Sequence, residues 1–408
     1  LRVLGGTLTT TPGLTINGRL VVLGNATLSA LTLPTGGVLE VRPPPSTGTT
    51  LTVNTGFTNN GTILLSGAGA FGTAVLSLPS GQTLTNVGRI RTLVGGGAGT
   101  RSLSGRLVNQ DTLDVRQHDL NVTVPSGQTW LNEATGVVRA DSAGDVSITA
   151  TGATVTNSGT ILLGARTWTQ TNGTLNLVAG SLSGDAGTLS TSGVTLNLDL
   201  ANARTRYNFG ATPTTLGTAL TIPGTDSLRV LGGTLTTTPG LTINGRLVAL
   251  GSATLSGLTL PAGGVLEVRP PASTGTTLTV STGFTNNGTI LLTSAGAFGT
   301  ATLSLPSGQS LTNAGVFRTQ VGGGTGTRAL TVPIFSNQSA GTIDVQQGLT
   351  LSGALEQGGT MTVSGGTTSI SGLTRLGVGS TTTRTAGTLT FAGGCTNLGG
   401  TITGATCP

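Results

Sequence analysis

Apolar and small polar residues alternate along most of the chain. Leu, Val and Ile recur at every second position with Thr, Ser or Asn between them, as in Leu14–Ile16 and Leu76–Leu78. A period of two places the apolar side chains on one side of a β-strand. No stretch carries the apolar stripe at 3.6-residue spacing that marks a helix. The pattern predicts an all-β protein with almost no helix.

A seven-residue motif recurs between these strands. It reads apolar, polar, Asn, any residue, Gly, small, apolar, and its best copies include Phe57–Ile63 and Leu84–Ile90. Asparagines of neighbouring well-formed copies are 23 to 27 residues apart, a period typical of a solenoid. With looser copies included, the asparagines are Asn59, Asn86, Asn109, Asn132, Asn157, Asn286, Asn313, Asn337 and Asn397.

The residue types of this motif suit the corner of a coil. Asn and Gly tolerate a positive φ, so a tight bend between two strands is easily formed there. Turns that stack also bring one asparagine above another, where the side chains can hydrogen-bond along the stack. We therefore expect a coil corner at each motif and a ladder formed by the nine asparagines.

A second corner has the sequence Pro-Ser-Gly-Gln and precedes an asparagine motif each time. It occurs at Pro79–Gln82, Pro125–Gln128 and Pro306–Gln309. One turn of the coil therefore uses both corners in a fixed order. At roughly 24 residues per turn, the chain makes about 17 turns. The predicted fold is a single-stranded parallel β-helix, or β-solenoid.

The chain also contains a tandem duplication. Leu1–Leu8 reappears as Leu228–Leu235, and the match continues without a gap as far as Arg101. We expect one β-solenoid copy in residues 1–227 and a second in residues 228–408, joined in one continuous rod.

Composition narrows the classes of function. Only 8% of residues are charged and 3% are aromatic, and all nineteen basic residues are Arg. Nucleic-acid-binding proteins cluster their positive charge and add aromatic residues on which bases stack. Because the arginines here are scattered and aromatics are few, nucleic acid is not expected as a partner. No run of eighteen apolar residues is present, so no transmembrane segment is expected.

The two cysteines, Cys395 and Cys407, lie twelve residues apart near the C-terminal end. A single pair in this position is typical of a disulfide in an exported protein, although two unpaired thiols are the alternative. The first residue is Leu1 rather than Met, so we expect a removed leader or a longer N-terminal region before it.

One histidine could belong to a catalytic arrangement. His118 lies near Asp111, Asp114 and Asp119, as in a constellation of His, Asp and Ser. The second copy has Gln346–Gly348 at the corresponding place, and a solvated turn explains the cluster with fewer assumptions. No catalytic residue is expected.

Cofactor, metal and sugar sites find little support. Gly67–Gly72 fits a G-x-G-x-x-G pattern without the βαβ unit that gives it meaning. Asp141 and Asp145 lack the spacing of a calcium loop, so neither a metal nor a cofactor is expected. Trp130 and Trp168 are too few, and too distant in sequence, to indicate a sugar-stacking groove.

Two surface features leave alternatives open. Six arginines could line one face and contact an anionic polymer, or could simply be a solvated face that limits aggregation: Arg2, Arg19, Arg42, Arg229, Arg246 and Arg269. Rows of Thr-x-Thr would indicate ice binding, but such rows are not evident at every turn.

The repeated motif and the Pro-Ser-Gly-Gln corners resemble the right-handed parallel β-helices of bacterial filamentous haemagglutinins and autotransporter passenger domains. The resemblance is one of repeat style and covers most of the chain. It implies an exported, non-enzymatic protein, outside the cell or on a bacterial surface, that acts as an adhesin or as a fibre subunit. Host or surface glycans are the expected partners.

The alternative function is a carbohydrate-binding or polysaccharide-degrading β-helix, such as a phage spike, for which a groove with paired carboxylates would be the mark. The fibre hypothesis predicts self-association end to end. Because the chain begins in an interior-type strand at Leu1, residues 391–408 are expected to stack on the Leu1 end of the next molecule.

Overall fold

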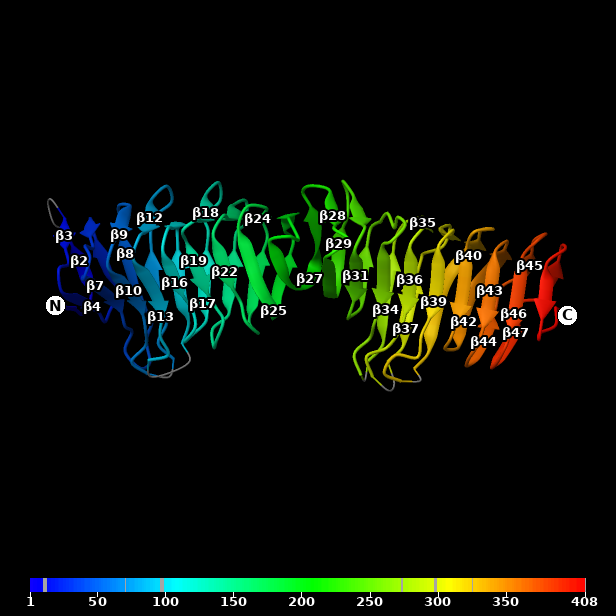
Figure 1. The fold of residues 1–408 in the computed structure, drawn as a ribbon. Coiled ribbons are helices and arrows are strands. Elements are labelled where there is room, and N and C mark those ends of the chain that lie inside the picture. The colour runs from blue at the N-terminus through cyan, green and yellow to red at the C-terminus, as the bar shows by residue number, and fades with distance from the viewer. Residues whose placement is uncertain are drawn as a thin grey trace. The chain divides into compact units, whose positions relative to one another are not determined.

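The computed structural model describes residues 1–9, 13–69, 71–95, 99–272, 274–296, 299–324 and 326–407. Its described residues form 49 strands and no helix. The chain divides into two compact units, Leu1–Arg206 and Tyr207–Pro408. Within each unit, strands of successive turns run side by side and pair in parallel (Figure 1). The predicted β-solenoid is confirmed.

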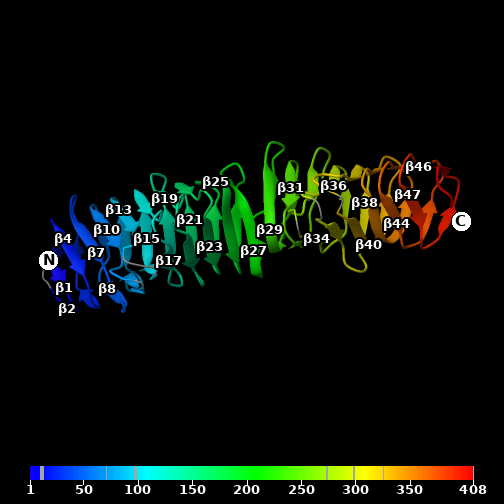
Figure 2. The ribbon, with the colours of Figure 1, turned by 90° about the horizontal axis from the view of Figure 1, so that it is seen from below.

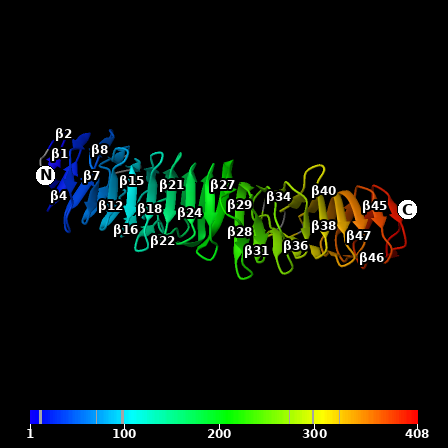
Figure 3. The same cartoon turned by 90° about the horizontal axis from the view of Figure 1, so that it is seen from above.

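Each turn contributes strands to three faces, named here in the order in which the chain visits them. The first face of unit 1 contains β1 (Arg2–Val3), β4 (Arg19–Val22), β7 (Val38–Val41), β10 (Thr62–Leu65), β13 (Arg89–Thr92), β16 (Thr112–Asp114), β19 (Val137–Arg139) and β22 (Thr160–Leu162). The second contains β2 (Gly6–Leu8), β5 (Ala26–Leu28), β8 (Thr49–Val53), β11 (Ala74–Ser77), β14 (Arg101–Ser104), β17 (Leu120–Thr123), β20 (Val146–Thr149) and β23 (Thr167–Thr171). The third contains β3 (Leu14–Thr15), β6 (Leu31–Thr32), β9 (Phe57–Asn59), β12 (Thr83–Asn86), β15 (Arg106–Asn109), β18 (Thr129–Asn132), β21 (Thr154–Asn157), β24 (Thr174–Leu177) and β26 (Thr195–Leu198). Figure 2 shows β4, β7, β10 and β13 in sequence, and Figure 3 shows β15, β18, β21 and β24.

Unit 2 repeats the three faces. Its first face contains β31 (Arg246–Ala249), β33 (Val265–Val268), β36 (Thr289–Leu292), β39 (Val316–Thr319), β41 (Thr342–Val345), β43 (Thr360–Val363), β46 (Thr381–Arg384) and β49 (Thr401–Thr403). Its second contains β32 (Ala253–Leu255), β34 (Thr276–Val280), β37 (Ala301–Ser304), β44 (Thr367–Ile370) and β47 (Thr388–Phe391). Its third contains β28 (Leu220–Ile222), β30 (Leu241–Ile243), β35 (Phe284–Asn286), β38 (Ser310–Asn313), β45 (Thr374–Leu376) and β48 (Cys395–Asn397).

Five long strands turn a corner or cross the division between the units. β25 (Ser181–Ser192) and β29 (Ser227–Thr236) each serve a first and a second face. β40 (Arg328–Asn337) and β42 (Leu349–Gln357) each serve the second and third faces of unit 2. β27 (Ala203–Leu216) spans the boundary between the units.

The solenoid has about nineteen turns rather than the predicted seventeen. Turn length varies, and the paired residues show it: Thr62 pairs with Arg89 across a long turn, whereas Arg246 pairs with Val265 across a short one. The asparagine motif is best formed in the long turns, so counting from it overestimates the mean length.

The core is a set of apolar columns that run through successive turns. On the first face of unit 1, one column of fully buried side chains consists of Leu20, Leu39, Ile63, Ile90, Leu113, Val138, Ile161 and Leu182. Burying one such side chain contributes about 1.5–3 kcal/mol. Strand alternation at period two therefore becomes a continuous hydrophobic interior.

Most of the aromatic rings belong to this interior. Trp130 and Trp168 are buried and meet edge to face, with ring centroids 5.6 Å apart. They are therefore neighbours despite their separation in sequence, although neither ring is exposed for stacking on a sugar. Phe317 and Phe335 also pack together, with tilted rings whose centroids are 5.2 Å apart.

The two kinds of corner use glycine differently. At the Pro-Ser-Gly-Gln corner, the Gln82 N–H donates to the Pro79 carbonyl at 3.1 Å and Gly81 has a φ of 84°, as in a type II turn. Gly61 of the asparagine corner does not have a positive φ. The prediction that positive φ explains the corner is therefore wrong at Gly61, although Gly399 of the looser last copy has a φ of 115°. A Cβ on Gly61 would lie 2.3 Å from the Gly37 carbonyl oxygen, so close stacking of turns requires the glycine.

Candidate functional surfaces

The motif asparagines form a buried ladder in each unit. Each Nδ2 donates to the Oδ1 of the asparagine one turn further along the chain. In unit 1 the steps are Asn59 to Asn86 at 2.6 Å, Asn86 to Asn109, Asn109 to Asn132 and Asn132 to Asn157 at 2.7 Å each. In unit 2, Asn286 donates to Asn313 and Asn313 to Asn337, both at 2.6 Å.

Each ladder ends on a different group. In unit 1, Asn157 donates to the Ser181 carbonyl at 3.0 Å. In unit 2, Asn337 donates to Gln357 Oε1 at 3.0 Å, so a glutamine extends the ladder by one turn. Asn397, which the sequence places in the ladder, is exposed and in register with Leu376. Its side chain instead caps its own corner through the N–H groups of Gly399 and Gly400.

The ladder amides also bond to backbone at the corners. Asn59 Nδ2 donates to the Arg89 carbonyl at 3.2 Å, and Asn59 Oδ1 accepts from the Gly61 N–H at 3.1 Å. Buried polar groups stabilise a fold when they are satisfied in this way. The ladder holds successive turns in register and has no face toward solvent.

Arginine dominates the outer side of the first face in unit 1, which we call the arginine face. On β1, β4, β7, β13, β16 and β19, or within two residues after them, lie Arg2, Arg19, Arg42, Arg89, Arg91, Arg116 and Arg139, with Glu40, Asp114 and Asp141. Asp111 precedes β16, at the asparagine corner. The structure therefore brings Arg2, Arg19 and Arg42 together, where they line one shallow pocket with Leu1 and Val21.

Two carboxylates of this face, Glu40 and Asp114, are buried beneath its arginines, whereas Asp141 is exposed. Glu40 is 4% exposed and accepts from Arg19 Nη2 at 2.5 Å and from the Ser66 hydroxyl at 2.7 Å. The Arg19 side chain remains 55% exposed. Unit 2 repeats the arrangement, with Arg246 Nη2 2.6 Å from the buried Glu267. Each pair presents its positive partner to solvent.

Asp114 is the centre of a cluster of ion pairs on this face. Its carboxylate lies 3.0 Å from Arg116 Nε, 3.3 Å from Arg91 Nε and 3.5 Å from Arg89 Nη2. Burial raises the pKa of Asp114, but hydrogen bonds from Arg116 and the charges of Arg116 and Arg91 outweigh it, so its pKa lies below the ordinary value. The carboxylate therefore stays ionised and holds three guanidinium groups.

His118 and Asp114 have different partners. His118 is half-buried and its Nδ1 lies 3.3 Å from the Asp119 carbonyl oxygen, whereas Asp114 is engaged by arginines. Within the part of the chain that the structure describes, no three His, Cys, Asp or Glu residues are grouped as metal ligands. Ala70, in the middle of the glycine-rich pattern, lies outside the described residues.

The second face carries a column of hydroxyl side chains on its outer side. In unit 1, nine successive turns place a Ser or Thr at the same register position: Thr7, Thr27, Thr52, Ser77, Ser104, Thr123, Thr149, Thr171 and Ser192. Unit 2 has a shorter version, Thr234, Thr254, Thr279, Ser304, Thr331 and Ser352. We call these the hydroxyl columns. All their side chains are exposed or half-buried.

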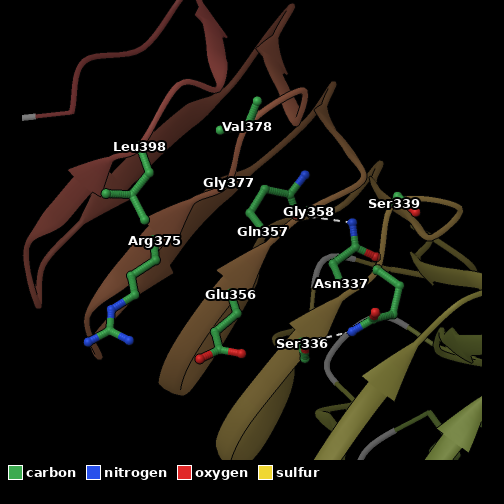
Figure 4. Close-up of a pocket in the computed structure, with 11 residues that line it drawn as sticks. Ser336, Asn337, Ser339, Glu356, Gln357, Gly358, Arg375, Gly377, Val378 and Leu398 are labelled. Atoms are coloured by element: carbon green, nitrogen blue, oxygen red, sulfur yellow. Dashed lines mark hydrogen bonds between the residues drawn. The ribbon is translucent and has the colours of Figure 1, made fainter.

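A groove of about 370 Å³ lies on the third face of unit 2 (Figure 4). Its lining includes the register partners Glu356 and Arg375 and the exposed apolar side chains of Val378 and Leu398. Glycoside hydrolysis generally requires two carboxyl groups on either side of the scissile bond. The groove lining, all of it within the described residues, contains one carboxylate, Glu356.

Two buried arginines escaped sequence reasoning. Arg101 and Arg328 are fully buried, and burial lowers the pKa of each. The Arg101 guanidinium donates to the Gly72, Leu93 and Val94 carbonyls at 3.1, 3.0 and 2.8 Å. It thus holds together the corner between the first and second faces. The sequence feature that could have indicated a buried Arg101 is its two-residue spacing from Leu103, which is also buried.

Cys395 and Cys407 form a disulfide, with Cα atoms 5.2 Å apart. The bond ties the last described residues to β48. Among the described residues, no helix is long and apolar enough to cross a membrane. Disulfides are typical of proteins that leave the reducing cytosol.

No protein-family model matches the chain, and a comparison with curated proteins finds no match. The parallel β-solenoid follows from the structure itself.

Proposed function

We propose that this chain is an exported, non-enzymatic β-solenoid that serves as a bacterial cell-surface adhesin or as the subunit of an extracellular fibre. The main support is the hydroxyl column of unit 1, which continues over nine turns from Thr7 to Ser192. Such a column is a long, repetitive contact surface rather than a recessed reaction site. Extended surfaces of this kind are the usual binding elements of solenoid proteins.

Two further observations support the proposal. The disulfide between Cys395 and Cys407 suits an oxidising compartment outside the cytosol. Buried carboxylates such as Glu40 and Asp114 are paired with arginine, which favours a structural role for them over a role in binding a substrate. In the fibre version of the proposal, copies associate end to end.

Cell fractionation with thiol labelling tests the proposal. Source cells are quenched with an alkylating reagent, fractionated and analysed by intact mass before and after reduction. The proposal expects the protein in the surface or culture fraction, with Cys395 and Cys407 protected until reduction. Recovery in the cytosol with both thiols alkylated would contradict export.

The hydroxyl column also favours a second function, adhesion to ice. Neighbouring strands are about 4.8 Å apart and alternate residues of a strand about 6.6 Å apart. Thr169 and Thr171 therefore form a small array of hydroxyl groups with their register partners Ser147, Thr149, Ser190 and Ser192. Retention of the chain on growing ice tests it. Thr149→Lys should abolish retention, whereas Thr112→Lys on the arginine face should not. Equal retention of both variants would exclude the column as the ice contact.

A further inference from the structure

We infer that the arginine face is a binding surface for an acidic polysaccharide, that is, a sugar polymer carrying carboxylate groups. The inference rests on the proposed function where it makes the molecule an adhesin, and it names the class of glycan. The face lies apart from both the hydroxyl columns and the groove at Glu356.

Positive charge on this face exceeds what its carboxylates neutralise. The seven arginines and three carboxylates of unit 1 leave four positive charges. In unit 2, β29, β31, β33, β39 and β41, with the two residues after each, hold four arginines and two carboxylates: Arg229, Arg246, Arg269 and Arg318 with Glu267 and Asp344. A solvated face built to limit aggregation would not need buried carboxylates beneath its arginines.

The negative and positive side chains of this face differ in exposure, and this difference decides which charges a ligand contacts. Side-chain exposure is 2% for Asp114 but 43% for Arg89, which pairs with it. It is likewise 2% for Glu267 but 45% for Arg246. Asp114 and Glu267 are thus shielded, and an approaching polymer contacts guanidinium groups first at these two sites. Asp141 and Asp344 are more accessible, with side chains 29% and 20% exposed.

The buried carboxylates also orient the arginines. Each guanidinium has five N–H donors, so Arg89, Arg91 and Arg116 offer about fifteen donors to the roughly four acceptor positions of Asp114. Most donors are therefore left for other partners. Because Asp114 holds these groups in place, a ligand carboxylate can accept two parallel hydrogen bonds without first ordering a mobile side chain.

The chemistry of the face favours a sugar polymer over a nucleic acid. Single-stranded nucleic acids are held by aromatic side chains on which bases stack. Among the described residues, the exposed aromatic ring is that of Phe71, which follows β10 and lies outside the set that defines the face. The outward side chains between the arginines include Thr62, Thr112 and Thr160, whose hydroxyls suit the hydroxyl groups of a sugar.

Binding of the full chain to polygalacturonate tests the inference, with neutral dextran and double-stranded DNA as comparison polymers. The decisive variant is Arg89→Gln with Arg139→Gln, because Arg91 and Arg116 still neutralise Asp114. The charge-matched control is Arg106→Gln with Arg166→Gln, two arginines of unit 1 outside the face. Melting temperatures show that both double variants fold.

The expected result is salt-sensitive binding to polygalacturonate, no binding to dextran, and weaker binding to DNA. The Arg89 and Arg139 variant should lose affinity roughly tenfold, and the control should change less than about twofold. Equal losses in both variants would reduce the effect to net charge and overturn the inference. Binding to DNA as tight as to polygalacturonate, or no binding to polygalacturonate, would also overturn it. None of these outcomes bears on export, which the fractionation experiment tests separately.

Discussion

Asn109 Nδ2 donates to Asn132 Oδ1 at 2.7 Å, and both side chains are fully buried. The two residues are register partners on β15 and β18, so their hydrogen bond joins one turn of the solenoid to the next. Removing one member of a polar ladder in an apolar interior is destabilising, because the neighbouring buried amides lose their hydrogen-bond partners.

Breaking the ladder should therefore destabilise the fold. Replacing Asn109 with Ala removes the acceptor of Asn86 and the donor to Asn132, and should lower the free energy of unfolding by about 1–3 kcal/mol. The control is Asn121→Ala on the outer side of β17, expected to change it by less than about 0.5 kcal/mol. Denaturant titration measures both. Equal effects would show that burial in the ladder does not matter.

Close stacking of turns predicts a contrast between two glycines. A Cβ on Gly61 would lie 2.3 Å from the Gly37 carbonyl oxygen, whereas a Cβ on Gly48 meets nothing nearer than 3.6 Å. Gly61→Ala should therefore lower the melting temperature by several degrees, consistent with a loss of about 1–3 kcal/mol from overpacking. Gly48→Ala should leave it nearly unchanged. A tolerant Gly61 would mean that adjacent turns can separate at the corner.

Stability should depend on pH through Asp114. Its pKa in the folded protein lies below the ordinary value, which in the unfolded chain is about 3.9. The stabilisation is thus fully present above about pH 4 and is lost as the pH falls through the folded pKa. Asp114→Asn should be less stable than the wild type at pH 7, and the gap should narrow at pH 2. Thermal melts at both values check this, and a constant gap would contradict it.

The disulfide should stabilise the last turns locally. Closing a loop this short contributes on the order of 3 kcal/mol, so Cys407→Ser should loosen β48 and β49. Hydrogen exchange should quicken in those strands while β36, in the same unit, stays protected. Unchanged protection of β48 and β49 would show that stacking alone holds the end.

The sequence pattern was sufficient to predict the fold because the alternation within strands and the repeated corner motif both indicated a solenoid. Period-two alternation gave the strands, and Phe57–Ile63 with its copies gave the stacking of turns. The predicted number of turns was too low because short turns, such as the one between Arg246 and Val265, carry no clear asparagine motif. Asn397 was misplaced because the motif does not reveal that Leu376 occupies the register position beneath it.

The surfaces were harder to predict than the fold. Thr52, Ser77 and Ser104 belong to one column only because of their register, and the loops between faces vary in length, so the sequence does not align them. Likewise, Arg89 and Asp114 are 25 residues apart in the sequence and meet only because the turns stack. Arg101 was missed because a charged residue in the interior is normally unfavourable, and only its ring of carbonyl acceptors makes it acceptable.

The central claim is that the protein works outside the cell as a structural or adhesive solenoid. Immunogold electron microscopy of intact source cells tests it most directly, with permeabilised cells as the control for antibody access. The account predicts gold particles on the outer surface or along extracellular fibres of intact cells. Labelling confined to the cytoplasm, and seen only after permeabilisation, would contradict it.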